Sequence, residues 1–138
     1  MQNQSQNPIY RILDANFNRL REALRVIEEF FRFIDEDERA CVALKGMRHA
    51  LTGMEASVGQ DALIGSRDTE SDCLASESRP EEMARANAED VLRANFKRAQ
   101  EACRVIEEYA KAVGAEQVSR GAKGMRFDLY AMQKVKKK

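Results

Sequence analysis

The sequence predicts an all-α protein: a duplicated helical hairpin that forms a four-helix bundle with approximate internal two-fold symmetry. Ala, Glu, Arg, Leu and Met are abundant in the 138 residues, and only two threonines and two prolines occur, which favours helices over strands. The 23-residue segment ILDANFNRLREALRVIEEFFRFI, from Ile12, matches VLRANFKRAQEACRVIEEYAKAV, from Val91, at 12 positions and an offset of 79. The tetrapeptide KGMR recurs at an offset of 78. Two ordered matches at nearly one offset indicate an internal repeat.

The first repeat, about residues 10–59, is expected to form two helices. Pro8 precedes the first helix, where its missing N–H is harmless. Asp35 and Asp37 offer caps for the second helix, and Gly59 is expected to end it. Apolar residues of the first helix recur at spacings of three and four: Leu13, Phe17, Leu20, Leu24, Ile27, Phe31 and Ile34. Those of the second helix are Leu44, Met47, Leu51, Met54 and Val58.

The second repeat, about residues 80–133, follows the same plan. Pro80 precedes Glu81 and Glu82, which suit the positive end of a helix dipole. Gly114 separates the two expected helices, and short connections predict that each pair forms an antiparallel hairpin. The apolar positions are Leu92, Phe96, Ala99, Cys103, Ile106, Ala110 and Val113, followed by Val118, Ala122, Met125, Leu129 and Met132.

Length, charge and composition exclude several classes of protein. A (β/α)₈ barrel needs about 250 residues. The formal charge is +0, from 23 basic and 23 acidic residues, so no bulk attraction for nucleic acid is predicted. No apolar run approaches the roughly 18 residues of a membrane span. Three cysteines without framework or metal-ligand spacing, behind a polar N-terminus, predict a cytoplasmic protein with reduced thiols. The basic end, residues 134–138, is expected to be a frayed tail.

Residues 60–79 show no sustained helical period, and we expect them to form a central loop. A loop this long in a compact domain is unusual unless it has a function or is disordered. Arg67 offers planar donors for phosphate, and Thr69 adds a hydroxyl. Asp68 and Asp72 offer the oxygen ligands that Mg²⁺ prefers. A simple capped turn explains the same string of residues equally well.

Six polar residues recur at equivalent positions of the repeated helix. They are Asn16, Arg19, Glu22, Arg25, Glu28 and Glu29, matched by Asn95, Arg98, Glu101, Arg104, Glu107 and Glu108. At 100° per residue, Arg25 and Glu28 are expected to point outward, and the other four to line one flank of the apolar stripe. The set is explained by surface ion pairs, by buried Arg–Glu networks between the repeated helices, or by a shared binding constraint.

Two familiar kinds of site are not supported. The sequence has no GxxxxGK[ST] loop, so any nucleotide would bind without a P-loop. A carboxylate-bridged di-metal bundle needs two Glu-x-x-His pairs, and the only histidine, His49, belongs to none.

The two repeated helices, the SRDTESD loop and the two KGMR segments together resemble a known family from about Tyr10 to Met132. They are similar to the helical domain that some bacteria fuse before thiamine-phosphate synthase and that is also encoded alone, the non-ribokinase-like class of hydroxymethylpyrimidine-phosphate kinases. The resemblance implies phosphorylation of 4-amino-5-hydroxymethyl-2-methylpyrimidine phosphate to its diphosphate with ATP and Mg²⁺, in thiamine biosynthesis. Thiamine-phosphate synthase is then a possible partner, and the sequence leaves a homo-oligomer open.

The chemistry of this reaction suggests a role for each candidate residue. The expected catalytic residues are Arg67, Asp68 and Asp72, with both aspartates as Mg²⁺ ligands. The expected residues for binding the pyrimidine and the nucleotide are Asn16, Arg19, Glu22, Thr69, Asn95, Arg98 and Glu101.

Two other functions stay open at this point. One is a non-catalytic helical module that binds a thiamine intermediate or docks on the synthase. The family's loop commonly continues after the aspartate with a small residue and glycine, whereas Asp72 is followed here by Cys73 and Leu74, and this departure favours the module. The other is a purely structural interaction protein.

Overall fold

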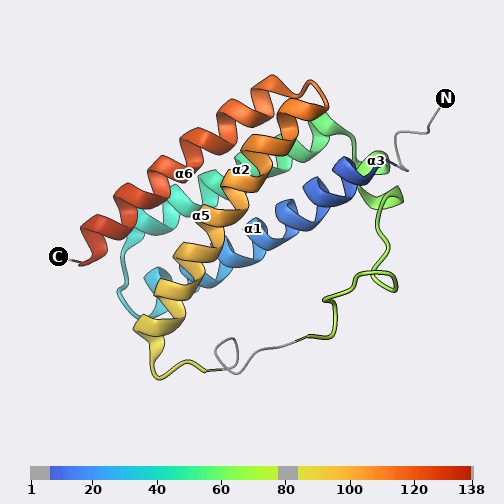
Figure 1. Cartoon of the computed structure of the whole chain (residues 1–138). Coiled ribbons are helices and arrows are strands. Elements are labelled where there is room, and N and C mark those ends of the chain that lie inside the picture. Colours follow the sequence, from blue (N-terminus) through green and yellow to red (C-terminus); the bar gives the residue numbers. More distant parts are fainter. Residues whose placement is uncertain (1–6, 78–83, 138) are drawn as a thin grey trace.

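The computed structural model describes residues 7–77 and 84–137, which form helices joined by turns and contain no β-strand (Figure 1). The long helices are α1 (Pro8–Phe33), α2 (Glu38–Val58), α5 (Ala88–Ala112) and α6 (Glu116–Lys137), and a short helix, α3 (Gln60–Gly65), follows α2. The predicted all-α class is confirmed.

Side-chain caps fix where three of the helices begin. The side chain of Asn7 accepts a hydrogen bond from the Ile9 amide before Pro8, and the Asp37 carboxylate accepts one from the Ala40 amide at 3.0 Å. Asn87 caps α5, so this helix begins at Ala88, and residues 84–87 are not helical. The expected start at Pro80, Glu81 and Glu82 lies outside the described residues.

The basic end is not the frayed tail that the sequence predicted, because α6 continues to Lys137. The ammonium group of Lys136 lies 3.6 Å from the carboxylate of Asp35 and 5.5 Å from the ring centre of Phe30. Asp35 thus pairs with Lys136, and of the two expected caps it is Asp37 that caps α2. These contacts with the end of the first hairpin hold the last turn of α6 against the protein.

The two hairpin turns differ in length by one residue. Helices α1 and α5 end at residues 79 apart, whereas α2 and α6 begin at residues 78 apart. The residue lost between the two sequence landmarks is therefore lost in the turn. In the shorter turn the Ala115 amide donates to the Ala110 carbonyl at 2.9 Å, and Gly114 has a φ of 71°, as in a Schellman motif.

The core lies where α1 packs against α5, and each of these helices also packs against its hairpin partner. Phe31, near the end of α1, meets Phe96, near the start of α5, with ring centres 6.3 Å apart, so the two helices run antiparallel. Most of the predicted apolar positions are buried, but Ile34 is 55% exposed in the turn after α1. Met54, Val58, Val113 and Met132 are only partly buried. The pairing of α1 with α2 and of α5 with α6 supports a duplicated hairpin as our interpretation of this architecture.

Residues 60–65 form α3, although the sequence predicted a loop there. Gly59 separates α2 from α3 with a φ of 113°, a conformation that favours glycine. Leu63 is 1% exposed, and α3 packs against α1 and α2. A six-residue helix with one core side chain has no detectable period, and for this reason the sequence missed it.

Candidate functional site

An ion pair between a buried glutamate and a partly buried arginine joins the two helices of each hairpin. In the first hairpin Arg48 donates to both carboxylate oxygens of Glu28, at 2.9 and 3.2 Å. In the second, Arg126 donates to one oxygen of Glu107, at 2.8 and 3.3 Å. Both arginines come from the KGMR segments. Glu28 was expected to point outward, but it is 7% exposed, because α2 covers that flank of α1. The repeated Arg–Glu pairs lie within the hairpins rather than between the repeated helices.

A second contact between the helices has changed its chemistry between the repeats. In the first hairpin the guanidinium group of Arg21 binds the carboxylate of Glu55. At the equivalent positions of the second hairpin, the Gln100 amide donates to the Gln133 carbonyl oxygen at 2.8 Å. Both residues of the contact differ between the repeats. The first repeat has an ion pair where the second has a pair of amides.

Segment 66–77, which follows α3, is anchored to α1 by an ion pair. The guanidinium group of Arg67 donates to both oxygens of the buried Asp14 carboxylate, at 2.7 and 2.8 Å. One turn earlier, Arg11 donates to the carbonyl of Asp68 at 2.5 Å. Arg67 therefore fixes the segment beside α1, a role that sequence reasoning missed because Asp14 has no acidic counterpart in the second repeat.

The two aspartates of this segment stabilise its own turns. Asp68 accepts a hydrogen bond from the Ser71 amide at 3.1 Å, and Asp72 accepts one from the Leu74 amide at 3.0 Å. The hydrogen bonds from Ser71 hold the pKa of the exposed Asp68 carboxyl below its usual value. Within the described ranges, no three His, Cys, Asp or Glu side chains gather into a group suited to a metal ion.

The anchor predicts how Asp14→Asn will behave. We expect the segment to detach more often, so that limited proteolysis cuts within 66–77 about tenfold faster, since a hydrogen bond to a charged group contributes about 1.5–3 kcal/mol. Far-ultraviolet circular dichroism should not change. Asp90→Asn is the matched control, because it removes a partly exposed carboxylate that pairs with Arg93 inside α5. Equal cleavage rates in the two variants would show that the Arg67 contact does not hold the segment.

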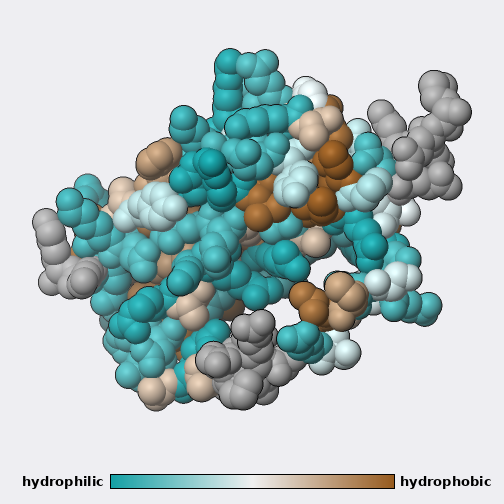
Figure 2. Space-filling view, viewed as in Figure 1, coloured by the Kyte–Doolittle hydropathy of each residue, from teal (hydrophilic) through white to brown (hydrophobic). Residues whose placement is uncertain are grey.

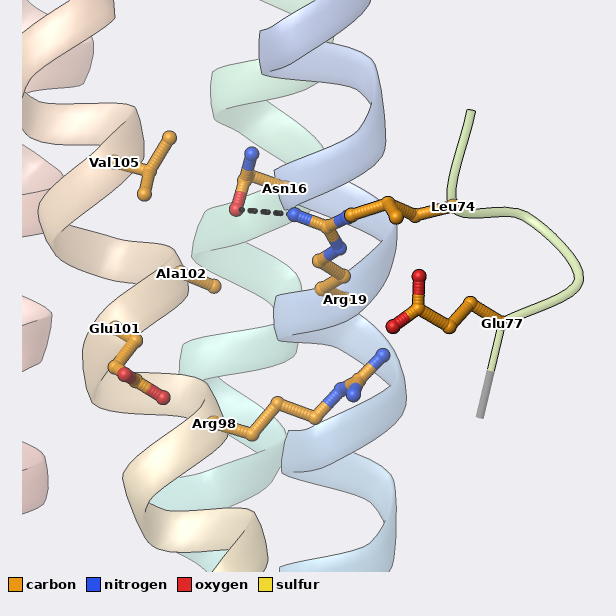
Figure 3. Close-up of a pocket in the computed structure, with 8 residues that line it drawn as sticks. All are labelled: Asn16, Arg19, Leu74, Glu77, Arg98, Glu101, Ala102 and Val105. Carbon is orange, nitrogen blue, oxygen red and sulfur yellow. Dashed lines mark hydrogen bonds between the residues drawn. The ribbon is translucent and has the colours of Figure 1, made fainter. Parts of the chain in front are cut away.

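A cleft of about 620 Å³ lies between α1, α5 and segment 66–77. Figure 2 shows an opening between the body of helices and the chain that follows α3. Because α1 and α5 run antiparallel, Arg19 and Arg98, which are equivalent in the two repeats, reach this one cleft from opposite sides (Figure 3). The lining residues are Asn16, Arg19, Leu74, Glu77, Arg98, Glu101, Ala102 and Val105.

The cleft holds two arginines and two glutamates, because Glu77 and Glu101 line it together with Arg19 and Arg98. Within residues 7–77 and 84–137 neither guanidinium group forms an ion pair, and Arg19 donates a hydrogen bond to the Asn16 amide oxygen at 3.5 Å. Arg48, Arg67 and Arg126, by contrast, are each bound to a carboxylate. Two guanidinium groups with unused donors on one cleft suit an anion such as phosphate.

A second hollow, of about 480 Å³, adjoins this cleft and shares Asn16, Arg19 and Val105 with it. We call it the side compartment. Its walls are the first turns of α1, the end of α5 and the middle of segment 66–77. The remaining lining residues are Pro8, Arg11, Ile12, Ala15, Ser71, Asp72, Cys73 and Tyr109.

The structure brings together part of the predicted site. Asn16, Arg19, Arg98 and Glu101 line the cleft, and Asp72 lines the side compartment. Five predicted residues line neither space: Glu22, Arg67, Asp68, Thr69 and Asn95. The Asn95 amide donates to the Val91 carbonyl at 2.8 Å, just as Asn16 donates to Ile12 at 2.9 Å. The sequence missed Glu77, Val105 and Tyr109, which lie outside the repeated polar set.

The fold is all-helical, and its cleft is lined by two arginines and two glutamates. The ThiD2 family model matches residues 11–135, and the chain belongs to the ThiD2 family. No solved structure matches the chain.

The chain is also similar to proteins named thiamine-phosphate synthase. It is 38% identical to one from Nostoc punctiforme over 94% of this chain and 36% of that protein. It is 42% identical to one from Thermosynechococcus vestitus over 89% and 34%, and 39% identical to one from Synechocystis over 96% and 37%. The chain thus spans about a third of the length of the curated relatives it matches, and these relatives place its family in thiamine biosynthesis. Within the described residues, each helix is too short or too polar to cross a lipid bilayer.

Proposed function

We propose that the chain transfers a phosphoryl group from MgATP to 4-amino-5-hydroxymethyl-2-methylpyrimidine phosphate, which yields the diphosphate. The observation that carries this proposal is the pair of equivalent arginines, Arg19 and Arg98, which line one cleft and form no ion pair within the described residues. Membership of the ThiD2 family and similarity to thiamine-phosphate synthases support it.

The proposed reaction needs charge screening more than a strong base. The acceptor oxygen belongs to a phosphate monoester, whose second pKa is about 6, so the oxygen is already ionised near neutral pH. Two polyanions must then approach each other and align. Arg19 and Arg98 would screen both phosphates, one from each side of the cleft. The carboxylate of Glu101 faces the same space and would accept the Mg²⁺ that arrives with ATP.

The direct test is turnover. Purified chain with MgATP and the pyrimidine monophosphate should release ADP and the pyrimidine diphosphate in equal amounts, measured by chromatography. A known hydroxymethylpyrimidine-phosphate kinase in the same assay serves as the positive control. A folded chain that forms no diphosphate in the validated assay contradicts the proposal.

The lengths of the relatives favour one alternative to the kinase. In those proteins about two thirds of the length lies outside the matched region, so the matched region there is one part of a larger polypeptide. The alternative is a non-catalytic module that binds a thiamine intermediate or docks on the synthase. A rise in melting temperature with the pyrimidine monophosphate, without turnover, would select it over the kinase.

A further inference from the structure

We propose that the side compartment binds a flat aminopyrimidine ring through the exposed face of Tyr109. The inference rests on the proposed function and extends it, because both of its substrates carry such a ring: the pyrimidine of the acceptor and the adenine of ATP. The shared chemistry is an aromatic face with an exocyclic amine on its edge.

The compartment combines an apolar surface with one aromatic side chain. Ile12 and Ala15 of α1 and Val105 of α5 give it apolar walls, and Tyr109 lies one turn beyond Val105. The Tyr109 residue is 41% exposed although it stands beside this hollow. Stacking on an aromatic side chain stabilises a bound base and tolerates different bases, because each has a π face.

The equivalent position of the first repeat is closed. Phe30 corresponds to Tyr109 at the offset of 79, yet it is 5% exposed. The ring of Phe31 lies against it with centres 5.9 Å apart, and the ammonium group of Lys136 lies 5.5 Å from its centre. The two-fold repeat therefore offers two equivalent aromatic positions, and only the one in α5 is open to a ligand.

The side compartment also lies beside the cleft, so that the phosphate of a bound ring could reach the cleft. It shares Asn16 and Arg19 with the cleft, so a ring beside Tyr109 would direct its phosphate toward Arg19 and Arg98. Asp72 stands at the edge, oriented by its hydrogen bond from the Leu74 amide. A carboxylate there can accept a hydrogen bond from an exocyclic amine.

Calorimetric titration of the whole chain with each ligand separately tests this inference. The ligands are ATP with Mg²⁺ and the pyrimidine monophosphate. We expect Tyr109→Leu to raise the Kd of one of them by about tenfold or more, and Tyr109→Phe to leave it within about twofold, because the ring rather than the hydroxyl makes the contact. Phe33→Leu is the control, since it removes an exposed aromatic ring from the other end of α1.

The outcomes separate this inference from the proposed function. Weaker binding of the pyrimidine monophosphate alone assigns the compartment to the acceptor, and weaker binding of ATP alone assigns it to adenine. An unchanged Kd for both, or the same loss for both, overturns the inference even if the chain is an active kinase. If the wild-type chain binds a ligand without turnover, the proposed kinase activity is contradicted. The Kd values of the Tyr109 variants then still test the binding of the ring. A wild-type chain that binds neither ligand overturns both.

Discussion

Replacing Arg98 with alanine is expected to lower kcat/KM for phosphoryl transfer by about 100-fold, the loss typical of removing one preorganised donor to a developing charge. The side chain projects from α5 into the cleft and forms no ion pair within the described residues, so its removal breaks no ion pair there. Initial rates at varied concentrations of both substrates provide the measurement. Arg19→Ala should give a similar loss, because Arg19 is the equivalent residue on α1.

Arg39→Ala is the matched control for Arg98→Ala. Arg39 is exposed near the start of α2, also forms no ion pair in the described ranges, and lies outside the residues that line the cleft. The control should keep wild-type rates and correct for the loss of one positive charge from the protein. If Arg39→Ala and Arg98→Ala were equally active, the cleft would not be where the phosphates meet.

Glu107→Ala is expected to lower the free energy of unfolding by about 3 kcal/mol, because it leaves the guanidinium group of Arg126 mostly buried without its partner. Urea denaturation followed by circular dichroism provides the measurement. Glu108→Ala is the control: this carboxylate pairs with Arg104 and Lys111 but is half exposed, and its loss should cost less than about 1 kcal/mol. Similar urea midpoints for the two variants would show that the Glu107–Arg126 pair does not stabilise the hairpin.

The same pair predicts a pH dependence. Burial alone would raise the pKa of Glu107, but the hydrogen bond and charge of Arg126, helped by Arg104 and Lys111, outweigh it and hold the pKa below its ordinary value of 4.5. A carboxyl whose pKa is lower in the folded state stabilises the protein above its unfolded pKa and loses that contribution as the pH falls through the folded pKa. Wild-type stability should therefore decline below about pH 4 more steeply than that of Glu107→Gln.

Helical periodicity predicts the long helices well, because a stripe of buried residues every three or four positions depends on the helix alone. The internal repeat, by contrast, marked Arg19 and Arg98 as equivalent residues, and both line one cleft. Periodicity does not predict burial where a neighbouring helix covers the outward side of a residue. Glu28 stands at an outward angle on α1, but α2 packs on that side and buries it. A helical wheel gives the direction of a side chain but not which other helix packs against it.

The difference between Phe30 and Tyr109 shows the same limit. Both are aromatic residues at one position of the repeated helix, and the sequence gives no sign of which is covered. Phe31 and Lys136 lie against the ring of Phe30, whereas Tyr109 lines the hollow beside segment 66–77. The position of that segment depends in turn on Arg67 and Asp14, which are 53 residues apart in the chain and cannot be paired from their spacing.

The equivalence of Arg19 and Arg98 has a consequence for how the cleft is assembled. One hairpin supplies a single guanidinium group, so half of the polypeptide cannot form the proposed anion site alone. Covalent joining turns the encounter of the two halves into an intramolecular event, with an effective concentration set by the connecting chain. The paired charges therefore stay together however far the protein is diluted, whereas two separate hairpins would part.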